Sequence, residues 1–172
     1  MQTILRPGPT EVNTLVLSAS LARNRQRRYP HRVSTEEKPY VLDDQIGFVL
    51  RRVTQRHIAI FSEAIPELTT TQFATLAKLA ELGSLSQNHL GRVTAMDAAT
   101  IKGVVDRLRK QGLVGTTADP GDKRRLTVQM TPAGRQLFDR TVRLAARVSA
   151  RTTAPLTAEE QEQIMALLLK LI

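Results

Sequence analysis

The chain has 172 residues and no cysteine, and its 25 lysines and arginines against 16 aspartates and glutamates give a formal net charge of +9. The length suits one domain with extensions, and the lack of cysteine excludes disulfides and thiolate metal sites. The positive charge favours a polyanionic partner, and no apolar run is long enough to predict a membrane span.

Residues 1–40 form a basic extension that stands apart from the rest of the chain. Pro7 and Pro9 interrupt any early regular structure, and the segment from Arg23 to Arg32 carries five arginines and no acidic residue. A basic arm of this kind often binds nucleic acid. A mobile, solvated arm is the more common alternative, and the sequence leaves both interpretations open.

The segment from Leu42 to Ile65 has apolar residues at helical spacing, and Pro66 ends the predicted helix. Its apolar side comprises Ile46, Val49, Leu50, Val53, His57, Ile60, Phe61 and Ala64. A lone histidine on such a side is usually a core residue with its hydrogen bonds satisfied, and a phenylalanine there usually serves packing.

Two helices follow, a long one and a short one. Thr69 and Gln72 form the pattern of a capping box, with Leu68 and Phe73 placed as a hydrophobic staple, and Gly83 ends the helix. The apolar face of this helix is predicted at Phe73, Leu76, Ala77 and Ala80. A second helix, from Ser86 to Val93, is too short to be stable without neighbours.

A third helix is predicted between Asp97, its N-cap, and Gly112, a natural residue after the C-cap. Its apolar stripe comprises Ile101, Val104, Val105 and Leu108. The opposite face is mostly small and comprises Ala98, Ala99, Thr100, Lys102 and Gly103. Small residues let DNA come close, and the first residues of a helix in the major groove reach base edges. Packing against another helix is the alternative explanation.

A β-hairpin is predicted from strands at 113–117 and 126–130, the second with apolar residues in strict alternation. The loop between them has a Pro-Gly turn followed by Lys123, Arg124 and Arg125. Such a tip suits phosphates or a narrow minor groove, although a solubilising loop is the more common case. The order of helix, short helix, helix and hairpin is that of a winged helix-turn-helix.

The C-terminal part predicts two more helices. Thr131 and Pro132 read as an N-cap followed by proline at the first helical position, and this helix runs to about Arg151. Thr157 and Glu160 form another capping box, after which the chain ends in Ile164, Leu167, Leu168, Leu171 and Ile172. Each such side chain left in water would forgo roughly 1.5 to 3 kcal/mol, so this end requires a partner surface.

From about Asp43 to the C-terminus the sequence resembles the MarR family of bacterial transcriptional regulators. The most specific patterns are D-R-L-x-x-x-G-L-V from Asp106, D-P-x-D-x-R from Asp119, and L-T-x-x-G, in which Met130 takes the leucine's place. The resemblance implies a mainly α fold with a small β-hairpin, in which a winged helix-turn-helix at 67–131 is joined to a helical dimerisation region formed by 41–66 and 132–172.

The resemblance also assigns roles to residues of the DNA-binding part. It pairs Asp122 of the loop with Arg107 of the third helix, which a charge-assisted hydrogen bond could hold, and it sends Arg124 into the minor groove. Ser86 and Gln87 join the expected DNA contacts. A two-fold homodimer would read a pseudo-palindrome on double-stranded DNA, with half-sites about one turn apart.

The expected function is that of a cytoplasmic, nucleoid-associated repressor whose DNA binding is relieved by a small aromatic or phenolic acid, a ligand class implied by the resemblance. Arg51, His57 and Phe61 are the candidates for ligand contact. No cofactor, metal or membrane partner is expected. The alternative is an architectural protein that binds DNA by charge alone. No nucleophile elbow, phosphate loop or set of metal ligands supports an enzyme.

Overall fold

A computed structural model describes residues 39–118 and 126–172. The chain divides into two compact units, Met1–Val49 and Leu50–Ile172. Most of the predicted basic extension and the tip of the predicted hairpin lie outside the described residues. The functional site is therefore built from the larger unit.

The first unit corrects the predicted start of the first helix. Leu42–Asp44 form a 3-10 turn, η2, and the α-helix α2 begins only at Ile46 and ends at Ala64. Gln45 separates the two, with extended backbone (φ −85°, ψ 129°). Its side-chain amide donates a hydrogen bond of 3.0 Å to the carbonyl of Val41. The apolar periodicity of the segment did not show this break, because the apolar positions that define it begin only at Ile46, after the break.

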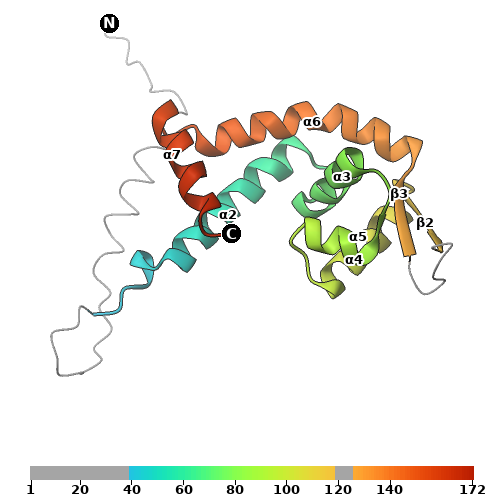
Figure 1. The fold of residues 1–172 in the computed structure, drawn as a ribbon. Coiled ribbons are helices and arrows are strands. Elements are labelled where there is room, and N and C mark those ends of the chain that lie inside the picture. Colours follow the sequence, from blue (N-terminus) through green and yellow to red (C-terminus); the bar gives the residue numbers. More distant parts are fainter. Residues whose placement is uncertain (1–38, 119–125) are drawn as a thin grey trace, which may run out of the picture. The chain divides into compact units, whose positions relative to one another are not determined.

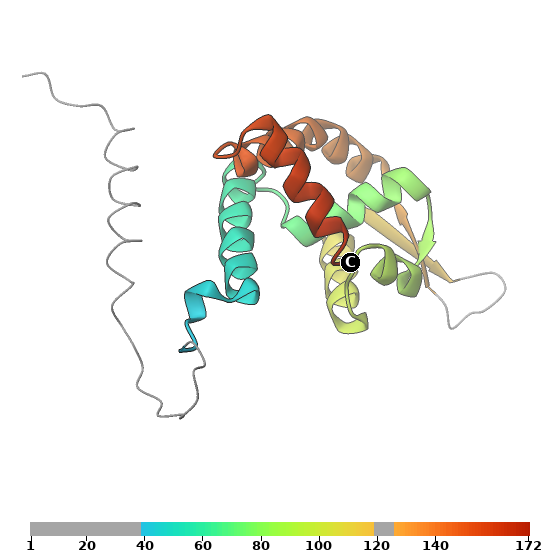
Figure 2. The ribbon, with the colours of Figure 1, turned by 60° about the vertical axis from the view of Figure 1, so that its left-hand side comes forward.

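The second unit holds the rest of α2 and eight further elements, which Figure 1 labels. In chain order they are α3 (Thr70–Leu82), β1 (Leu85–Ser86), α4 (Gln87–Val93), α5 (Ala98–Lys110), β2 (Val114–Ala118), β3 (Leu126–Met130), α6 (Pro132–Thr153) and α7 (Ala158–Leu169). The views in Figures 1 and 2 both show α3, α4 and α5 gathered beside the small sheet. This order of elements is a winged helix-turn-helix followed by two helices.

The sheet is antiparallel and has three strands in the order β1-β3-β2. Val114 pairs with Met130 at one end of the hairpin and Ala118 with Leu126 at the other. Strand β2 therefore lies one residue later than predicted. The third strand, β1, was not predicted, because two residues are too few to show an alternating pattern; its Leu85 pairs with Val128.

Predicted caps account for most of the helix ends. Both capping boxes, at Thr69 and at Thr157, are confirmed, as are the N-caps Asp97 and Thr131. Helix α5 ends at Lys110 with Gln111 as its C-cap, and Gly112 follows with a φ of +71°, a conformation that glycine adopts without strain. The amide of the residue after it donates back to the carbonyl of Leu108 at 2.9 Å, as in a Schellman motif.

The core lies between the helices and the inner face of the sheet. Its most deeply buried large side chains, each under 2% exposed, include Ile65, Leu76, Leu90, Ile101, Leu108 and Val128. Aromatic rings join three of the helices: the ring centroids of Phe61 and Phe73 are 5.7 Å apart, and those of Phe73 and Phe138 are also 5.7 Å apart. Helices α2, α3 and α6 are thus packed against one another.

The buried face of α3 differs from the predicted one. The structure buries Gln72 and Thr75 along with Leu76 and Leu79, whereas Phe73, Ala77 and Ala80 are only half-buried. The two polar side chains are buried because their hydrogen bonds are made: Gln72 bonds to the amide of Thr69 and to Gln111, and Thr75 donates to the carbonyl of Thr71.

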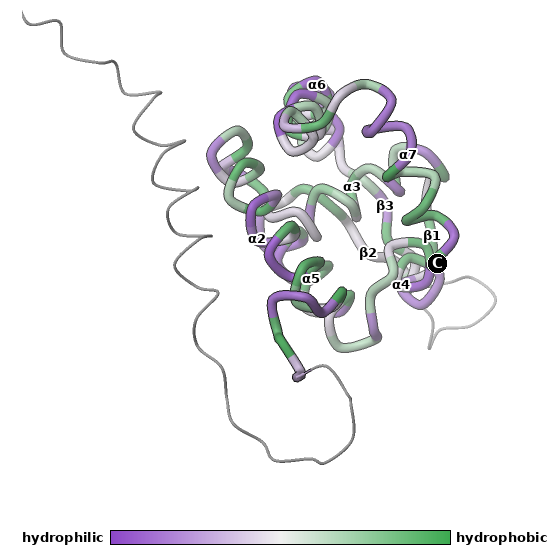
Figure 3. The backbone as a smooth tube through the Cα atoms, turned by 90° about the vertical axis from the view of Figure 1, so that its left-hand side faces the viewer, coloured by the Kyte–Doolittle hydropathy of each residue, from purple (hydrophilic) through white to green (hydrophobic). Residues whose placement is uncertain are grey.

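Most of the exposed apolar side chains on the described helices lie on α2 and α7. On α7 and the last residues after it these are Ile164, Met165, Leu167, Leu169, Leu171 and Ile172. On α2 they include Leu50 and Val53, and Figure 3 shows hydrophobic residues alternating with hydrophilic ones along this helix. Among residues 39–118 and 126–172, no helix is both long and apolar enough to span a membrane.

Candidate nucleic-acid interface

Helices α4 and α5 pack closely at Gly91. Ser86 caps α4 by accepting a hydrogen bond from the amide of His89 at 3.3 Å. A Cβ atom added at Gly91 would lie 3.1 Å from the carbonyl oxygen of Met96 and 3.2 Å from Cγ2 of Ile101. Glycine is therefore the residue that allows this approach, and α4 supports α5 directly.

Helix α5 has a buried side and an open side. Ile101, Val104, Val105 and Leu108 are at most 2% exposed and anchor the helix to the core. The residues predicted to face DNA lie on the other side: Ala98, Ala99, Thr100 and Lys102 are exposed and Gly103 is half-exposed. Among the described residues, no atom outside the neighbouring backbone of α5 itself lies within 4 Å of a Cβ built at Gly103. This side carries mostly short side chains, as close contact with a groove requires.

Asp97 fixes the start of α5 through Thr100. One carboxylate oxygen accepts from the amide of Thr100 at 2.8 Å, and the other accepts from its hydroxyl at 2.9 Å. The backbone hydrogen bond, followed by the hydroxyl bond, lowers the pKa of Asp97 below its usual value. The Thr100 hydroxyl donates its hydrogen bond to Asp97, so the hydroxyl oxygen can still accept a hydrogen bond from a donor on a base.

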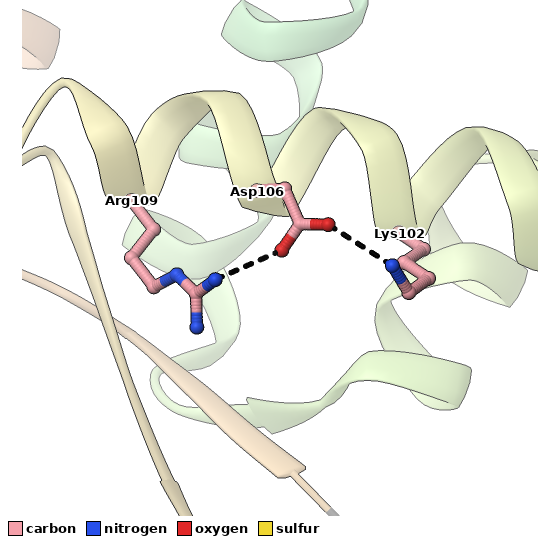
Figure 4. Close-up of polar contacts among 3 residues, drawn as sticks. All are labelled: Lys102, Asp106 and Arg109. Atoms are coloured by element: carbon pink, nitrogen blue, oxygen red, sulfur yellow. Dashed lines mark hydrogen bonds and ion pairs between the residues drawn. The ribbon is translucent and has the colours of Figure 1, made fainter.

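A charged cluster on α5 was not predicted from the sequence. Figure 4 shows Asp106 between two cations: its Oδ2 lies 3.2 Å from Nζ of Lys102, and its Oδ1 lies 3.3 Å from a terminal nitrogen of Arg109. The hydrogen bond from Lys102, with the nearby positive charges, lowers the pKa of Asp106. The spacings of four and three residues along a helix were the available signal.

The predicted wing is described only at its base. Residues 119–125, which include Asp122, Lys123, Arg124 and Arg125, lie outside the described residues, so their roles stay predictions. Arg107, the proposed partner of Asp122, is exposed on α5. Ser86 and Gln87, at the start of α4, are half-buried.

The three candidates for ligand contact lie on α2, and the structure brings two of them together. The ring centroids of His57 and Phe61 are 6.5 Å apart, and the phenylalanine is buried, at 3% exposure. Arg51 is exposed. At 3.6 residues per turn it lies about 120° around the helix from His57 and about 80° from Phe61, so it does not share a side with His57.

Hydrogen bonds define the state of the His57 ring. Its Nδ1 lies 3.0 Å from Oγ1 of Thr152, and that hydroxyl donates its only proton to the carbonyl of Val148 at 2.8 Å. With that proton used, Nδ1 is placed to donate to the hydroxyl of Thr152, and Nε2 has no hydrogen bond within the described part of the chain.

Further polar contacts tie α2 to the end of α6 beside His57. A guanidinium nitrogen of Arg56 donates to the carbonyl of Arg151 at 3.2 Å, and the side chain of Arg151 pairs with Glu63 at 2.8 Å. This stretch of α2 is thereby held in place by backbone and side-chain contacts. No group of His, Asp and Glu within the described part of the chain is arranged to hold a metal ion.

Helix α5, which has mostly short side chains on its exposed side, packs on the short helix α4 and is followed by the hairpin of β2 and β3. This arrangement defines a DNA-binding protein of the winged helix-turn-helix class. The model of the MarR family matches residues 68–126. The chain also shares 39% identity over 145 residues with the transcriptional repressor NicR of Pseudomonas putida, covering 83% of this chain and 92% of NicR. The chain therefore belongs to the MarR family of transcriptional regulators.

Solved structures agree with this assignment. A probable transcriptional regulator from Pseudomonas aeruginosa has 51% identity and a TM-score of 0.74, with 77% of this chain and 100% of that chain covered. BpsR of Bordetella bronchiseptica, whose DNA binding is regulated by 6-hydroxynicotinic acid, has 38% identity and a TM-score of 0.74, with 78% and 97% covered.

Proposed function

We propose that this regulator is a homodimeric repressor that binds a pseudo-palindromic operator and is released by a small aromatic carboxylic acid. The observation that carries the proposal is the open side of α5, where small residues and Gly103 leave room for a groove. Two such helices related by a two-fold axis would meet half-sites about one helical turn apart.

The exposed apolar residues of α7 support the dimer. Leu167 is 51% exposed, Leu169 61% and Leu171 68%, which is costly for side chains of this size unless a partner covers them. In the proposed division of the chain, 41–66 and 132–172 form the dimerisation region and 67–131 the DNA-binding domain. The partner surface is the same region of a second copy.

The ligand proposal rests on His57 and on two relatives. NicR is a repressor, and BpsR responds to 6-hydroxynicotinic acid. In this chain Nε2 of His57 lies on a ring beside that of Phe61, and an aromatic acid could place its ring against the phenylalanine. Its carboxylate would accept a hydrogen bond from Nε2 when that atom also carries a hydrogen, as in a charged imidazole. We propose that such a ligand stabilises a conformation with lower DNA affinity. A preference of about 1.4 kcal/mol for that state lowers the affinity tenfold.

The proposal is tested by fluorescence anisotropy with DNA from the region upstream of the gene, at physiological salt. We expect a saturable complex with that DNA and weaker binding to a shuffled sequence of equal length. Addition of 6-hydroxynicotinic acid should release the DNA, whereas pyridine, which lacks the carboxylate, should not. Equal affinity for the two DNAs would overturn the proposal.

The same titration separates the repressor from an architectural protein, which the net charge of +9 also favours. Binding by charge alone shows no preferred site and falls steeply with salt. For the wing, we expect Arg124→Ala to weaken binding to operator and shuffled DNA alike, because a minor-groove or phosphate contact carries little sequence information.

A further inference from the structure

The charged cluster on the recognition helix contains an acidic group where a DNA-binding surface would be expected to be only basic or neutral. Asp106 has 37% of its side chain exposed, and its partners Lys102 and Arg109 have 69% and 54% exposed. All three therefore face solvent together. Both oxygens of the carboxylate are engaged, one with each cation.

The position of Asp106 on α5 places it beside the open side of the helix. Gly103 lies one turn before it and Lys102 lies four residues before it, so all three occupy neighbouring positions on the helix surface. Apart from the neighbouring backbone of α5, no atom of residues 39–118 and 126–172 lies within 4 Å of a Cβ built at Gly103. A DNA duplex that approaches this glycine closely would bring its phosphates near the carboxylate.

Asp106 is ionised at physiological pH, as an ordinary aspartate is, and the bond from Lys102 with the neighbouring positive charges lowers its pKa further. A persistent negative charge repels phosphates. It also occupies two cations that could otherwise neutralise phosphates on any sequence.

We propose that Asp106 determines specificity by suppressing non-specific binding: it holds Lys102 and Arg109 away from phosphates until a correct site offers base-edge acceptors in exchange. This inference rests on the proposed function, since it concerns the same DNA-binding surface. Non-specific complexes offer phosphates but no matched base edges, so they lose more from the carboxylate than the operator complex does.

The size of the effect follows from counterion release. Each additional neutralised phosphate steepens the plot of log K against log salt by about 0.9 for duplex DNA. If one cation is freed, lowering the salt from 1 M to 0.1 M strengthens non-specific binding by about eightfold more in the variant than in the parent. If two cations are freed, the slope steepens by about 1.8.

The test compares Asp106→Asn with the parent on shuffled duplex DNA over a range of salt concentrations. We expect tighter non-specific binding, a steeper salt dependence and a smaller ratio of operator to shuffled affinity. Asp106→Glu keeps the charge and should retain the parental salt slope. An unchanged slope and affinity for Asp106→Asn on shuffled DNA would overturn the inference.

A matched control is available on α3. Glu81 forms a similar exposed pair with Lys78, at 2.7 Å, and lies outside the recognition helix. Glu81→Gln removes the same charge and should leave DNA binding unchanged; if it has the same effect as Asp106→Asn, the cause is net charge and the inference fails. If the parent binds operator and shuffled DNA equally well, the proposed function is contradicted. The comparison of Asp106→Asn with the parent on shuffled DNA would still decide whether Asp106 suppresses non-specific binding.

Discussion

The hydroxyl of Thr131 donates a hydrogen bond of 2.7 Å to the carbonyl of Gly112, and this bond joins the end of the recognition helix to the start of α6. The same oxygen accepts from the amide of Gly134 at 3.1 Å, as the N-cap of α6. The backbone amide of Thr131 adds a bond to the carbonyl of Leu113 at 3.1 Å. One residue thus connects the proposed DNA-reading helix α5 to the proposed dimerisation helix α6.

We therefore expect Thr131→Ala to lower the free energy of unfolding by about 1 to 2 kcal/mol, because a cap and a second hydrogen bond are lost together. Thr131→Ser keeps the hydroxyl and should lose less than half as much. Urea denaturation followed by circular dichroism measures both variants. If the serine variant is as unstable as the alanine variant, the methyl group and not the hydroxyl is responsible.

At Gly103 we expect DNA affinity and stability to change in opposite directions. Gly103→Leu fills open space, so unfolding should become harder by roughly 0.5 to 1 kcal/mol through better helix propensity. Operator affinity should fall by more than about tenfold, since a good base contact is worth about 1 to 3 kcal/mol and the leucine would keep the helix from the groove. Gly103→Ala should give a smaller loss. Unchanged operator binding by the leucine variant would show that another face reads DNA.

The cap at Asp97 predicts a pH dependence with a defined sign. Its pKa is lowered in the folded protein, so its stabilising effect is present above the unfolded value, near 4. The effect is lost as pH falls through the lower folded value. Asp97→Asn keeps a capping oxygen without the charge. The difference in stability between parent and variant should be constant from pH 5 to 7 and shrink below pH 4; a difference that grows on acidification would contradict this.

For the dimer, we predict that Leu167→Asp yields monomers in sedimentation velocity experiments and loses operator binding. Burial of an unpaired carboxylate in an apolar interface is strongly unfavourable. Ala158→Asp places the same charge at the exposed first position of the same helix, where the helix dipole tolerates it, and should remain dimeric. A dimeric Leu167→Asp protein would assign the interface to another surface.

For the ligand, we predict that His57→Ala weakens the response to 6-hydroxynicotinic acid by about tenfold or more, the value of one charge-assisted hydrogen bond. We expect DNA binding without ligand to stay within about twofold of the parent, because His57 lies on α2 and not on α5. Thr152→Val removes only the group that orients the ring and should give an intermediate response. Isothermal titration with the acid measures these changes directly.

Local patterns predicted most of the fold, because the contacts that end a helix are made within a few residues. The capping boxes at Thr69 and Thr157 and the glycine at 112 are of this kind. Strand β1 was missed because its pairing with β3 joins residues about forty positions apart, and no local signal encodes such a contact.

The site shows the same limit. The open side of α5 was visible from helical spacing alone, since its position follows from the buried stripe. The bond between His57 and Thr152 joins residues 95 positions apart and required the structure. The Lys102 and Asp106 pair is different, because its four-residue spacing is visible in the sequence and is sufficient to predict such a contact.

The close contact at Gly91 affects how a regulator of this kind can acquire a preference for a new operator. A Cβ atom there would lie 3.1 Å from the carbonyl oxygen of Met96 and 3.2 Å from Cγ2 of Ile101, so a larger residue would require the supporting and recognition helices to shift apart. We therefore expect new operator preferences to arise mainly by exchange of solvent-side residues, which can change without moving the two helices. Divergence among paralogues should accordingly concentrate in the outward positions of α5.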